Sequence, residues 1–478
     1  MDRKVRPYLF YDTTQALCSH CLRTIQAHVI FRDEKVFLDK WCPVHGDERV
    51  MISDDVDYYK LCREVYVKQP EMPFYFNTKM QFGCPYDCGL CPDHMQHSCL
   101  SIIDINEACN LECPVCYADS GPKKQIHYDL ARICRMLDVV VKNEKEPDVL
   151  QISGGEPTIH PQFFDILDEV KKRPFRHVMI NTNGLRIASD DVFVERLANY
   201  QKGLEIYLQF DSLQDERLQV LRGASLWRIR EAAIAKLNQY GISTTLVMTV
   251  KKGLNDDEIG EVIRYGLSQP CVRGVTLQPI QNAGRVENYQ LTDHKLTISE
   301  IRRKIAEQSG VFQLADVIPV PCNPDNLAMA YALKLAGDVT PLTGLIDPAV
   351  LIDASKNTIV FETQPDLKAQ LFKTFSTNLD ATEQANCLSE LMCCLPAVQH
   401  TNLSYENVFR VLIVNFMDAA TMDIRALKKS CIHFATEDKM IPFEAYNLFY
   451  RTPAQRETLA TIQQEVMRFY EQRSVKPN

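Results

Sequence analysis

The chain has 478 residues, of which 46% are hydrophobic and 24% are charged, and its formal net charge is −9. This length leaves room for roughly two or three domains. The acidic balance argues against a nucleic-acid-binding protein that relies on bulk electrostatics. The opening MDRKVRPYLFYDTTQ lacks the apolar segment of a signal peptide. The apolar stretch 408–417 is too short to span a bilayer. We expect a cytoplasmic protein with at most peripheral membrane contact and no nucleic-acid partner.

Eighteen cysteines are a high number for a chain without an export signal. In such a chain, clustered cysteines more often bind metal than form disulfides. The composition predicts three parts: a cysteine-rich metal-binding domain over 1–100, an α/β domain over 101–283, and a mainly helical region over 284–478.

The first cysteines form two close pairs. Cys18 and Cys21 have the spacing C-x₂-C, and Cys42 with His45 forms C-x₂-H. Four such ligands suit tetrahedral zinc or a rubredoxin-like iron. Closed coordination would make this a structural site that supplies folding energy to a domain with little core. The alternative is a set of reduced buried thiols beside an unrelated surface histidine.

Next comes the segment GCPYDCGLC, in which Cys84, Cys88 and Cys91 have the spacing C-x₃-C-x₂-C. A closed four-iron cluster needs four thiolates. Cys99, eight residues after Cys91, is the predicted fourth ligand of an auxiliary [4Fe–4S] cluster. His94 and His97 lie in the same segment and are the alternatives to Cys99.

Between residues 101 and 283 the pattern alternates between short β-rich runs and helical stretches. The predicted strands are 100–106, 148–154, 177–183, 204–211, 243–250 and 272–279, and helical examples are 127–143 and 161–173. This alternation predicts parallel strands with right-handed crossovers. We therefore expect a partial (β/α)6 TIM-type barrel, whose active site lies at the carboxyl ends of the strands. A doubly wound open sheet is the structural alternative.

A second C-x₃-C-x₂-C triplet, Cys109, Cys113 and Cys116, directly follows the first predicted strand. It has no convenient fourth cysteine, because Cys134 falls within a predicted helix. Three ligands leave one iron open, by the same logic that separates catalytic from structural zinc sites. The spacing and position therefore indicate that the second triplet is catalytic and the first is not.

With Tyr117 beside the third cysteine and SGGEP after the second strand, residues 100–283 resemble the radical S-adenosylmethionine (SAM) superfamily. The resemblance implies that Cys109, Cys113 and Cys116 bind a [4Fe–4S] cluster whose open iron is chelated by SAM. One-electron reduction, from a partner such as ferredoxin or flavodoxin, would cleave SAM and produce a 5′-deoxyadenosyl radical. The cofactor supplies this chemistry, and the protein orients it.

The resemblance also implies residues that contact SAM. Gly154, Gly155 and Glu156 of the SGGEP turn would receive the SAM amino group, with glycine permitting close backbone approach. Four polar residues at the ends of the next two strands are further candidates for contacts with SAM or substrate: Asn181, Asn183, Gln209 and Asp211. Arg222 and Gln278 are additional candidates. The alternative for these polar residues is a capping role at strand ends.

The whole chain resembles a subgroup described as class D methyltransferase-like radical SAM proteins, which includes tetraether lipid synthases and dihydropterin methyltransferases. The shared segments are the N-terminal cysteine–histidine site, FGCPYDCGLC, IPVPC and SCIHFATEDKMIPFEAYNLFYR. Where archaeal members carry extra cysteines, this chain has Asn323, Asn326, Ser430 and Glu444.

The subgroup implies C–H activation leading to C–C bond formation or methyl transfer on a lipid-like or pterin-like small molecule. A non-catalytic iron–sulfur electron-transfer protein or a zinc-ribbon interaction protein is the alternative. The late cysteines leave two alternatives open, a third cluster or ordinary buried thiols; they are Cys322, Cys387, Cys393, Cys394 and Cys431.

Overall fold

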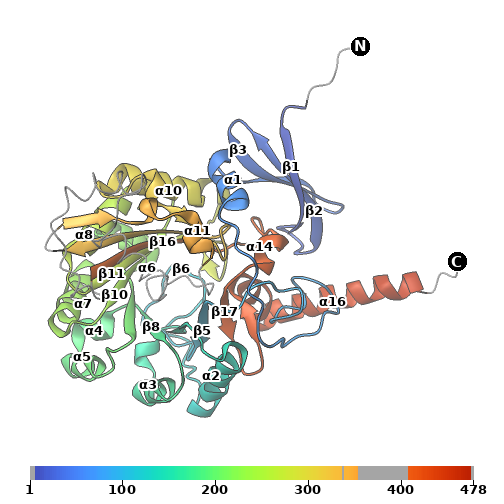
Figure 1. The fold of residues 1–478 in the computed structure, drawn as a ribbon. Coiled ribbons are helices and arrows are strands. Elements are labelled where there is room, and N and C mark those ends of the chain that lie inside the picture. Colours follow the sequence, from blue (N-terminus) through green and yellow to red (C-terminus); the bar gives the residue numbers. More distant parts are fainter. Residues whose placement is uncertain (1–5, 336–337, 354–406, 475–478) are drawn as a thin grey trace.

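The computed structural model describes residues 6–335, 338–353 and 407–474. The chain begins with a four-stranded antiparallel sheet in the order β1-β2-β3-β4, followed by one short helix. These elements are β1 (Leu9–Leu17), β2 (Thr24–Arg32), β3 (Lys35–Cys42), β4 (Gly46–Ser53) and α1 (Val56–Glu64). In Figure 1 this blue sheet stands beside the main body of the molecule.

The main body is built on eight adjacent parallel strands, in the order β16-β11-β10-β9-β8-β7-β5-β17. They are β16 (Val408–Val414), β11 (Val272–Pro279), β10 (Thr244–Val250), β9 (Leu204–Gln209), β8 (His177–Thr182), β7 (Val149–Ser153), β5 (Leu100–Asp104) and β17 (Ile432–Ala435). The six strands predicted from the sequence are β5 and β7 to β11, and the partial-barrel prediction is confirmed.

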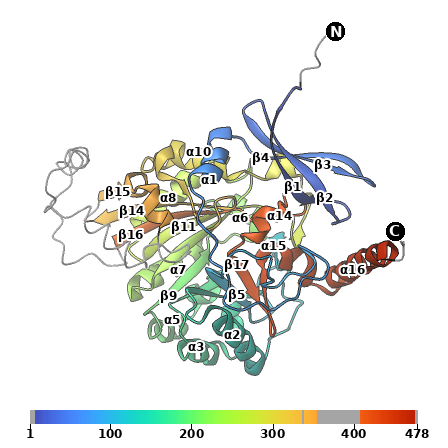
Figure 2. The ribbon, with the colours of Figure 1, turned by 45° about the vertical axis from the view of Figure 1, so that its right-hand side comes forward.

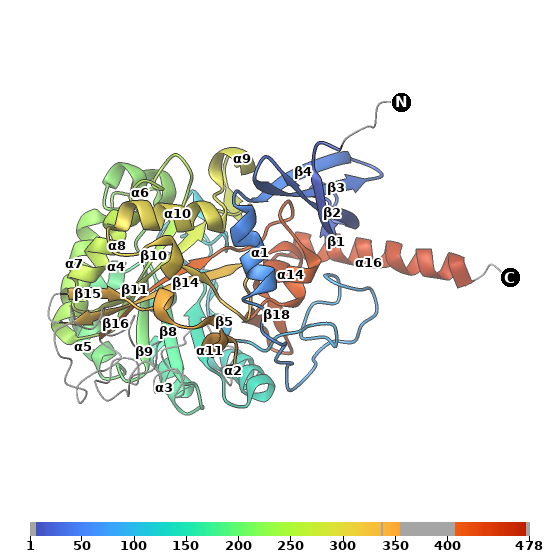
Figure 3. The ribbon, with the colours of Figure 1, turned by 45° about the horizontal axis from the view of Figure 1, so that its top comes forward.

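Helices cover the outer face of these strands, as Figures 1 and 3 show. They are α2 (Leu130–Glu144), α3 (Phe163–Lys171), α4 (Leu185–Ser189), α5 (Asp191–Ala198), α6 (Asp215–Arg222), α7 (Trp227–Tyr240), α8 (Ile259–Ser268) and α10 (Ile298–Ser309). The short α9 (Leu291–His294) lies beside the N-terminal sheet instead. The apolar residues of α2 illustrate why these segments are helical: Ile133, Leu137 and Val140 recur at steps of three and four and are all buried.

Side chains of the parallel strands alternate between two faces, as the two-residue period of a strand requires. Ile180 and Ile206 belong to the apolar core beneath the helices. Their neighbours Asn181 and Tyr207 point the other way and line an interior cavity. The alternation therefore separates a packing face from a functional face along each strand.

The C-terminal region contains strands as well as the predicted helices. Besides β16 and β17, its described residues include the antiparallel strands β13 (Ile318–Pro319), β14 (Leu327–Leu335), β15 (Asp338–Pro341) and β18 (Met440–Pro442). It also forms α11 (Pro348–Ile352), α14 (Ile424–Lys428), α15 (Phe443–Ala445), a π-helical turn (Tyr446–Tyr450) and α16 (Pro453–Ser474). β16 and β17 extend the barrel sheet at both edges, because their apolar runs fit beside buried parallel strands.

The N-terminal sheet and the C-terminal region pack against each other, as Figure 2 shows around α14. The Thr14 hydroxyl donates to Asp423 over 2.6 Å, and Arg425 pairs with Asp12. The buried Lys40 ammonium donates to the Leu17 and Ala420 carbonyls. In the described residues, no helix has both the length and the apolar character needed to cross a membrane.

Candidate active site and metal centres

Cys109, Cys113 and Cys116 lie in the loop that leaves the carboxyl end of β5, and all three line the interior cavity. A two-stranded ladder holds this loop, in which β6 (Val115–Cys116) pairs with β12 (Arg285–Val286). The Arg285 guanidinium donates to the Cys113 carbonyl over 2.7 Å. It also donates to the Ser120 carbonyl and to Asp119. Arg285 therefore fixes the triplet from outside, and sequence reasoning missed it because it lies about 170 residues away.

A buried ion pair supports the same loop from inside the barrel. Arg222 donates two hydrogen bonds to the Asp211 carboxylate, over 2.7 and 2.6 Å. The same guanidinium donates to the Val115 carbonyl between Cys113 and Cys116. Burial opposes ionisation of Asp211, yet its pKa is lowered because Arg222 outweighs that cost. Arg222 lines the cavity whereas Asp211 does not, so the structure places Asp211 behind Arg222.

The SGGEP turn packs directly on the backbone that leads into the triplet. A Cβ on Gly154, which has φ +140°, would lie 2.4 Å from Asn106 Oδ1. A Cβ on Gly155 would lie 2.1 Å from the Ala108 carbonyl oxygen. Both glycines line the cavity. They are needed because the turn after β7 and the loop after β5 pass each other without room for a side chain.

Glu156 ties the SGGEP turn to the end of β8. Its buried carboxylate accepts from the Thr158 hydroxyl over 2.6 Å and from the Thr182 hydroxyl over 2.7 Å. It also accepts from the Asn183 backbone N–H over 2.7 Å. Burial raises the pKa of Glu156, and these donors oppose the rise. The carboxylate thus has several protein partners, and a contact with the SAM amino group stays a prediction.

The other predicted cofactor residues lie around the same cavity. Tyr117, Asn181, Asn183, Gln209 and Gln278 all line it. Tyr117 Oη and the Asn181 amide both contact the Ser153 hydroxyl, each over 3.2 Å. Gln209 donates to Asp211, and Gln278 donates to Tyr207 Oη. The strand ends therefore present one polar surface opposite the cysteine triplet.

Arg230 of α7 is a cavity residue that sequence reasoning missed. It is fully buried, and Nη1 donates to the Asn183 carbonyl. Within the described part of the chain, its Nε and Nη2 atoms have no hydrogen-bond partner. Burial lowers its pKa to about 10, which leaves it charged at neutral pH. A buried cation with open donors at a cavity fits an anionic group of a bound molecule. Only the helical apolar pattern of α7 was visible in the sequence.

The geometry fits the cofactors that the triplet implies. Three thiols stand on one loop, and burial raises the pKa of Cys109 to about 12 when no metal is bound. A cation such as an iron centre would reverse that effect by binding the thiolate. The open donors of Arg230 suit the SAM carboxylate. Gly154 and Gly155 leave the cavity wall without side chains beside the triplet.

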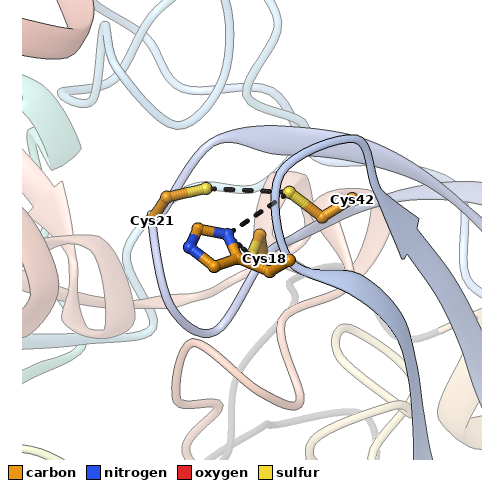
Figure 4. Close-up of side chains that lie close together, drawn as sticks. Cys18, Cys21 and Cys42 are labelled. Atoms are coloured by element: carbon orange, nitrogen blue, oxygen red, sulfur yellow. Dashed lines mark hydrogen bonds between the residues drawn. The ribbon is translucent and has the colours of Figure 1, made fainter.

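The N-terminal cysteines and histidine meet at the tips of two β-hairpins (Figure 4). Cys18 Sγ and Cys42 Sγ lie 3.4 and 3.5 Å from His45 Nδ1, and Cys21 Sγ lies 3.9 Å from Cys42 Sγ. All four ligand atoms lie within 4.8 Å of one another, which suits one tetrahedral ion. Burial opposes ionisation of Cys42, but the Val44 and His45 N–H groups help to lower its pKa to about 6.

Cys84, Cys88 and Cys91 form a separate group in a different environment. The hydrogen bond with Cys84 and burial both raise the pKa of Cys88, and Cys91 adds to the rise. Cys88 packs in an apolar cluster with Phe449, Leu459 and Ile462 of the C-terminal region. None of the three cysteines lines the barrel cavity.

The structure places Cys99 elsewhere than predicted. Its sulfur lies within 4.8 Å of those of Cys322 and Cys431, and the latter two are 3.8 Å apart. Cys99 immediately precedes β5, and Leu100 N–H donates to the Cys431 carbonyl where β17 joins that strand. Strand pairing therefore draws Cys99 to the C-terminal cysteines. Cys387, Cys393 and Cys394 lie outside the described residues.

The rings of His94 and His97 have partners outside the first triplet, although the His94 backbone N–H donates to the Cys91 carbonyl. His94 Nε2 is 2.9 Å from the Ser430 carbonyl and 3.0 Å from His433 Nε2. His97 Nδ1 is 2.9 Å from Glu144, and its Nε2 is 3.8 Å from Cys99 Sγ. Both alternatives to Cys99 therefore belong to the Cys99 region.

Comparisons with known proteins agree with this geometry. A model of the radical SAM superfamily matches residues 103–266. The chain carries a radical SAM domain. A second model, the HMPTM N-terminal zinc ribbon domain, matches residues 10–54 and contains the four-ligand site. The protein is thus a radical SAM enzyme with an N-terminal zinc ribbon, and the alternative of a non-catalytic carrier or interaction protein is set aside.

Among curated relatives, 7,8-dihydro-6-hydroxymethylpterin dimethyltransferase of Methanocaldococcus jannaschii is 28% identical over 92% of this chain and 94% of its own length. GTP 3′,8-cyclase of Peptoclostridium acidaminophilum is 26% identical over 38% of this chain and 57% of its own. A solved radical SAM methyltransferase from Sphaerobacter thermophilus aligns with TM-score 0.29 and 11% identity, over 62% of this chain and 73% of its own.

Proposed function

We propose that this radical SAM enzyme transfers a methyl group to a small pterin-like heterocycle bound in the barrel cavity. The observation that carries this proposal is the polar inner face of the sheet. Four amide side chains line the cavity from strands β7, β8, β9 and β11: Gln151, Asn181, Gln209 and Gln278. Similarity to a dihydropterin dimethyltransferase over nearly the whole chain supports the same substrate class.

An amide carries both donors and an acceptor, so a row of amides can match the alternating nitrogen and oxygen atoms of a heterocycle edge. Asn181, Gln209 and Gln278 each donate to one or two protein groups and keep further donor or acceptor capacity. An alkyl chain would leave that remaining capacity unused, which costs free energy at each group. Lipid-like substrates are therefore the less favourable alternative. Thr249 and Thr276 line the same surface and add hydroxyl groups to it.

Each part of the site has a task in this proposal. Cys109, Cys113 and Cys116 would hold the cluster, which supplies one-electron cleavage of one SAM and a carbon radical that takes a hydrogen atom from substrate. The methyl group would come from a separate donor such as a second SAM, which would leave as S-adenosylhomocysteine once the reductase supplies a second electron. Arg230 would hold the SAM carboxylate through its open Nε and Nη2 donors. Arg222 and Arg285 position the cysteine loop through the Val115 and Cys113 carbonyls.

Electrons for this chemistry would come from a reductase such as ferredoxin or flavodoxin. Cys84, Cys88 and Cys91 would hold an auxiliary iron–sulfur cluster between the barrel and the C-terminal helices. The Cys99, Cys322 and Cys431 sulfurs have the close spacing of ligands to one ion, whereas the ligands of a four-iron cluster bind different irons and stand farther apart. We therefore assign that group to a single metal ion.

The test is an anaerobic assay of the reconstituted enzyme with dithionite, SAM and a dihydropterin, followed by mass spectrometry. We expect 5′-deoxyadenosine together with a methylated pterin. Gln151→Leu and Gln278→Leu should reduce methylated product while SAM cleavage without substrate persists. Gln219→Leu, at an exposed position of α6, is the matched control. Product formed from an alkyl lipid and not from a pterin would contradict the substrate proposal.

A further inference from the structure

A second cavity lies where the N-terminal sheet meets the barrel and the C-terminal region. It is separate from the barrel cavity beside Cys109, Cys113 and Cys116, which is called the SAM cavity from here on. Its volume is about 320 Å³, within the range of small-molecule pockets. Its walls come from β3, β4, α1, the segment 291–299 and the segments 324–326 and 415–426. Three separate parts of the chain thus enclose one space.

Unpartnered polar atoms concentrate on the walls of this cavity. Among the described residues, five buried side-chain atoms of the lining have no hydrogen-bond partner: Tyr58 Oη, Tyr59 Oη, Arg63 Nε, Asn326 Nδ2 and Asn415 Oδ1. Tyr59 is 7% exposed and Asn326 is 3% exposed. Buried polar groups in native proteins are normally satisfied, so several orphans around one space indicate a missing occupant.

These unpartnered atoms indicate which kind of ligand fits the cavity. Four of the five atoms are hydrogen-bond donors, so they call for a ligand rich in acceptor oxygens. Arg63 stacks on the Tyr59 ring with 4.3 Å between guanidinium carbon and ring centre, and Asp325 holds one of its other nitrogens at 2.8 Å. Its Nε is therefore presented in a fixed orientation. A carboxylate or phosphate accepts such hydrogen bonds most strongly.

The rest of the lining favours an organic rather than an inorganic anion. Lys35, Arg49 and Lys295 of the lining add positive charge, whereas Asp325 and Asp423, which pair with Arg63, add negative charge. Apolar side chains complete the walls, including Phe37, Leu296 and Met417. A cavity with donors on one side and apolar walls around it matches a molecule with an anionic group on an apolar body.

The second cavity shares no lining residue with the SAM cavity. From the last residue of β16 onward, successive side chains of the extended chain face the two cavities in turn. Val414 and Phe416 line the SAM cavity, whereas Asn415 and Met417 line the second one. A molecule bound in the second cavity would therefore touch the back of the SAM-cavity wall without competing with SAM.

We propose that the cavity bounded by Tyr58, Tyr59, Arg63 and Asn326 is a second ligand site, which binds a small organic anion between the N-terminal sheet and the barrel. This site is independent of the methyl-transfer proposal, because it uses none of the residues that face the cysteine triplet.

The experiment uses the full-length, anaerobically reconstituted enzyme and titration calorimetry with benzoate and phenyl phosphate, with benzyl alcohol as the uncharged comparison. We expect one of the anions to bind at one site and benzyl alcohol not to bind. The double variant Tyr58→Phe/Tyr59→Phe removes only the two orphan hydroxyls. It should fold normally and weaken anion binding by about tenfold or more. Tyr75→Phe, at a partly exposed tyrosine outside the cavity, is the matched control.

Saturating SAM should leave anion binding to the wild-type protein unchanged, and the double variant should cleave SAM at the wild-type rate. A crystal of the protein soaked in phenyl phosphate should show density for the anion against Arg63 and Tyr59. Three results would overturn the proposal: neither anion binds, binding is unaltered in the double variant, or the cavity holds ordered water only.

Discussion

The two C-x₃-C-x₂-C triplets have the same local spacing and opposite surroundings. Cys109, Cys113 and Cys116 open onto a cavity at the carboxyl ends of the strands, beside two glycines, two arginines and several amide side chains. Cys88 belongs to an apolar cluster formed largely by the C-terminal helices, and Cys84 packs against that cluster. The spacing determines that cysteines can bind iron, whereas the fold determines whether substrate can reach it.

The contacts that hold the backbone around the two triplets also differ. The catalytic loop is held by side chains from distant strands and helices, such as Arg222 and Arg285. The first loop is held partly by its own residues, because Asp87 Oδ2 accepts the N–H groups of Gln81, Phe82 and Gly83 over 2.6 to 2.7 Å. The C-terminal region also holds it, since Tyr450 and Gln463 donate to the Tyr86 carbonyl. Precise placement of the second triplet relative to SAM would require support from several barrel elements, whereas a buried electron-transfer or structural cluster at the first triplet would not.

Single substitutions in the two triplets should give the largest difference in SAM cleavage. Cys113→Ala should abolish 5′-deoxyadenosine formation, because two thiolates cannot hold an open cluster in position. Cys88→Ala should lower iron content and slow turnover while some SAM cleavage persists. Cys134→Ala, on α2 and outside every cysteine group, should behave as wild type. Residual SAM cleavage in Cys113→Ala at the Cys88→Ala level would reverse the assignment.

Removing the buried ion pair should damage the catalytic loop without touching a cluster ligand. Arg222→Met leaves Asp211 buried and unpaired, which costs about 3–5 kcal/mol, and frees the Val115 carbonyl. We expect a lower thermal midpoint and less iron in the radical SAM site. Arg228→Met, at an exposed position of α7, should change the midpoint little. Equal thermal midpoints for the two variants would contradict the positioning role of Arg222.

The N-terminal site should affect stability and leave the chemistry intact. Cys42→Ala removes one of four closed ligands, so the protein should lose one metal ion per chain and its lowest thermal transition should shift downward. SAM cleavage per folded molecule should stay within about twofold of wild type, since the site lies outside the barrel cavity. Unchanged zinc and iron content in Cys42→Ala would show that the site holds no metal.

The smallest expected effect concerns Glu444, which is buried beside Ser430 near the Cys99 group. Burial raises its folded-state pKa from 4.5 to about 7. A carboxyl with a raised pKa favours the folded state while it is protonated, so stability falls as pH rises between those two values. Glu444→Gln should remove that loss, which amounts to about 3 kcal/mol. The measurement is the thermal midpoint of both proteins from about pH 4 to about pH 8. If the thermal midpoints of the two proteins change in parallel with pH, the raised pKa of Glu444 would be contradicted.

Local patterns were sufficient to predict the barrel and the ligands that lie close together in sequence. Six strands, the second triplet at the end of the first of them, and the Cys18–His45 pairs all depend on periodicity or spacing within a short segment. The SGGEP glycines were also found, although the structure shows that the loop after β5 also requires their small size.

Features that depend on distant pairing could not be predicted. Cys99 meets Cys322 and Cys431 only because β17 adds to the edge of the sheet beside β5. The short apolar runs of β16 and β17 do not show which strand they will join. Arg230 and Arg285 contact the site from a helix and a strand whose sequence patterns show only an apolar face or no regularity.

Electron paramagnetic resonance of two triple variants tests the central claim most directly. The variant with Cys84, Cys88 and Cys91 changed to alanine should keep a reduced cluster whose signal shifts when SAM is added, because one iron stays open. The variant with Cys109, Cys113 and Cys116 changed to alanine should show no SAM-dependent shift in any remaining signal. A SAM-dependent shift in the second variant and none in the first would contradict the account.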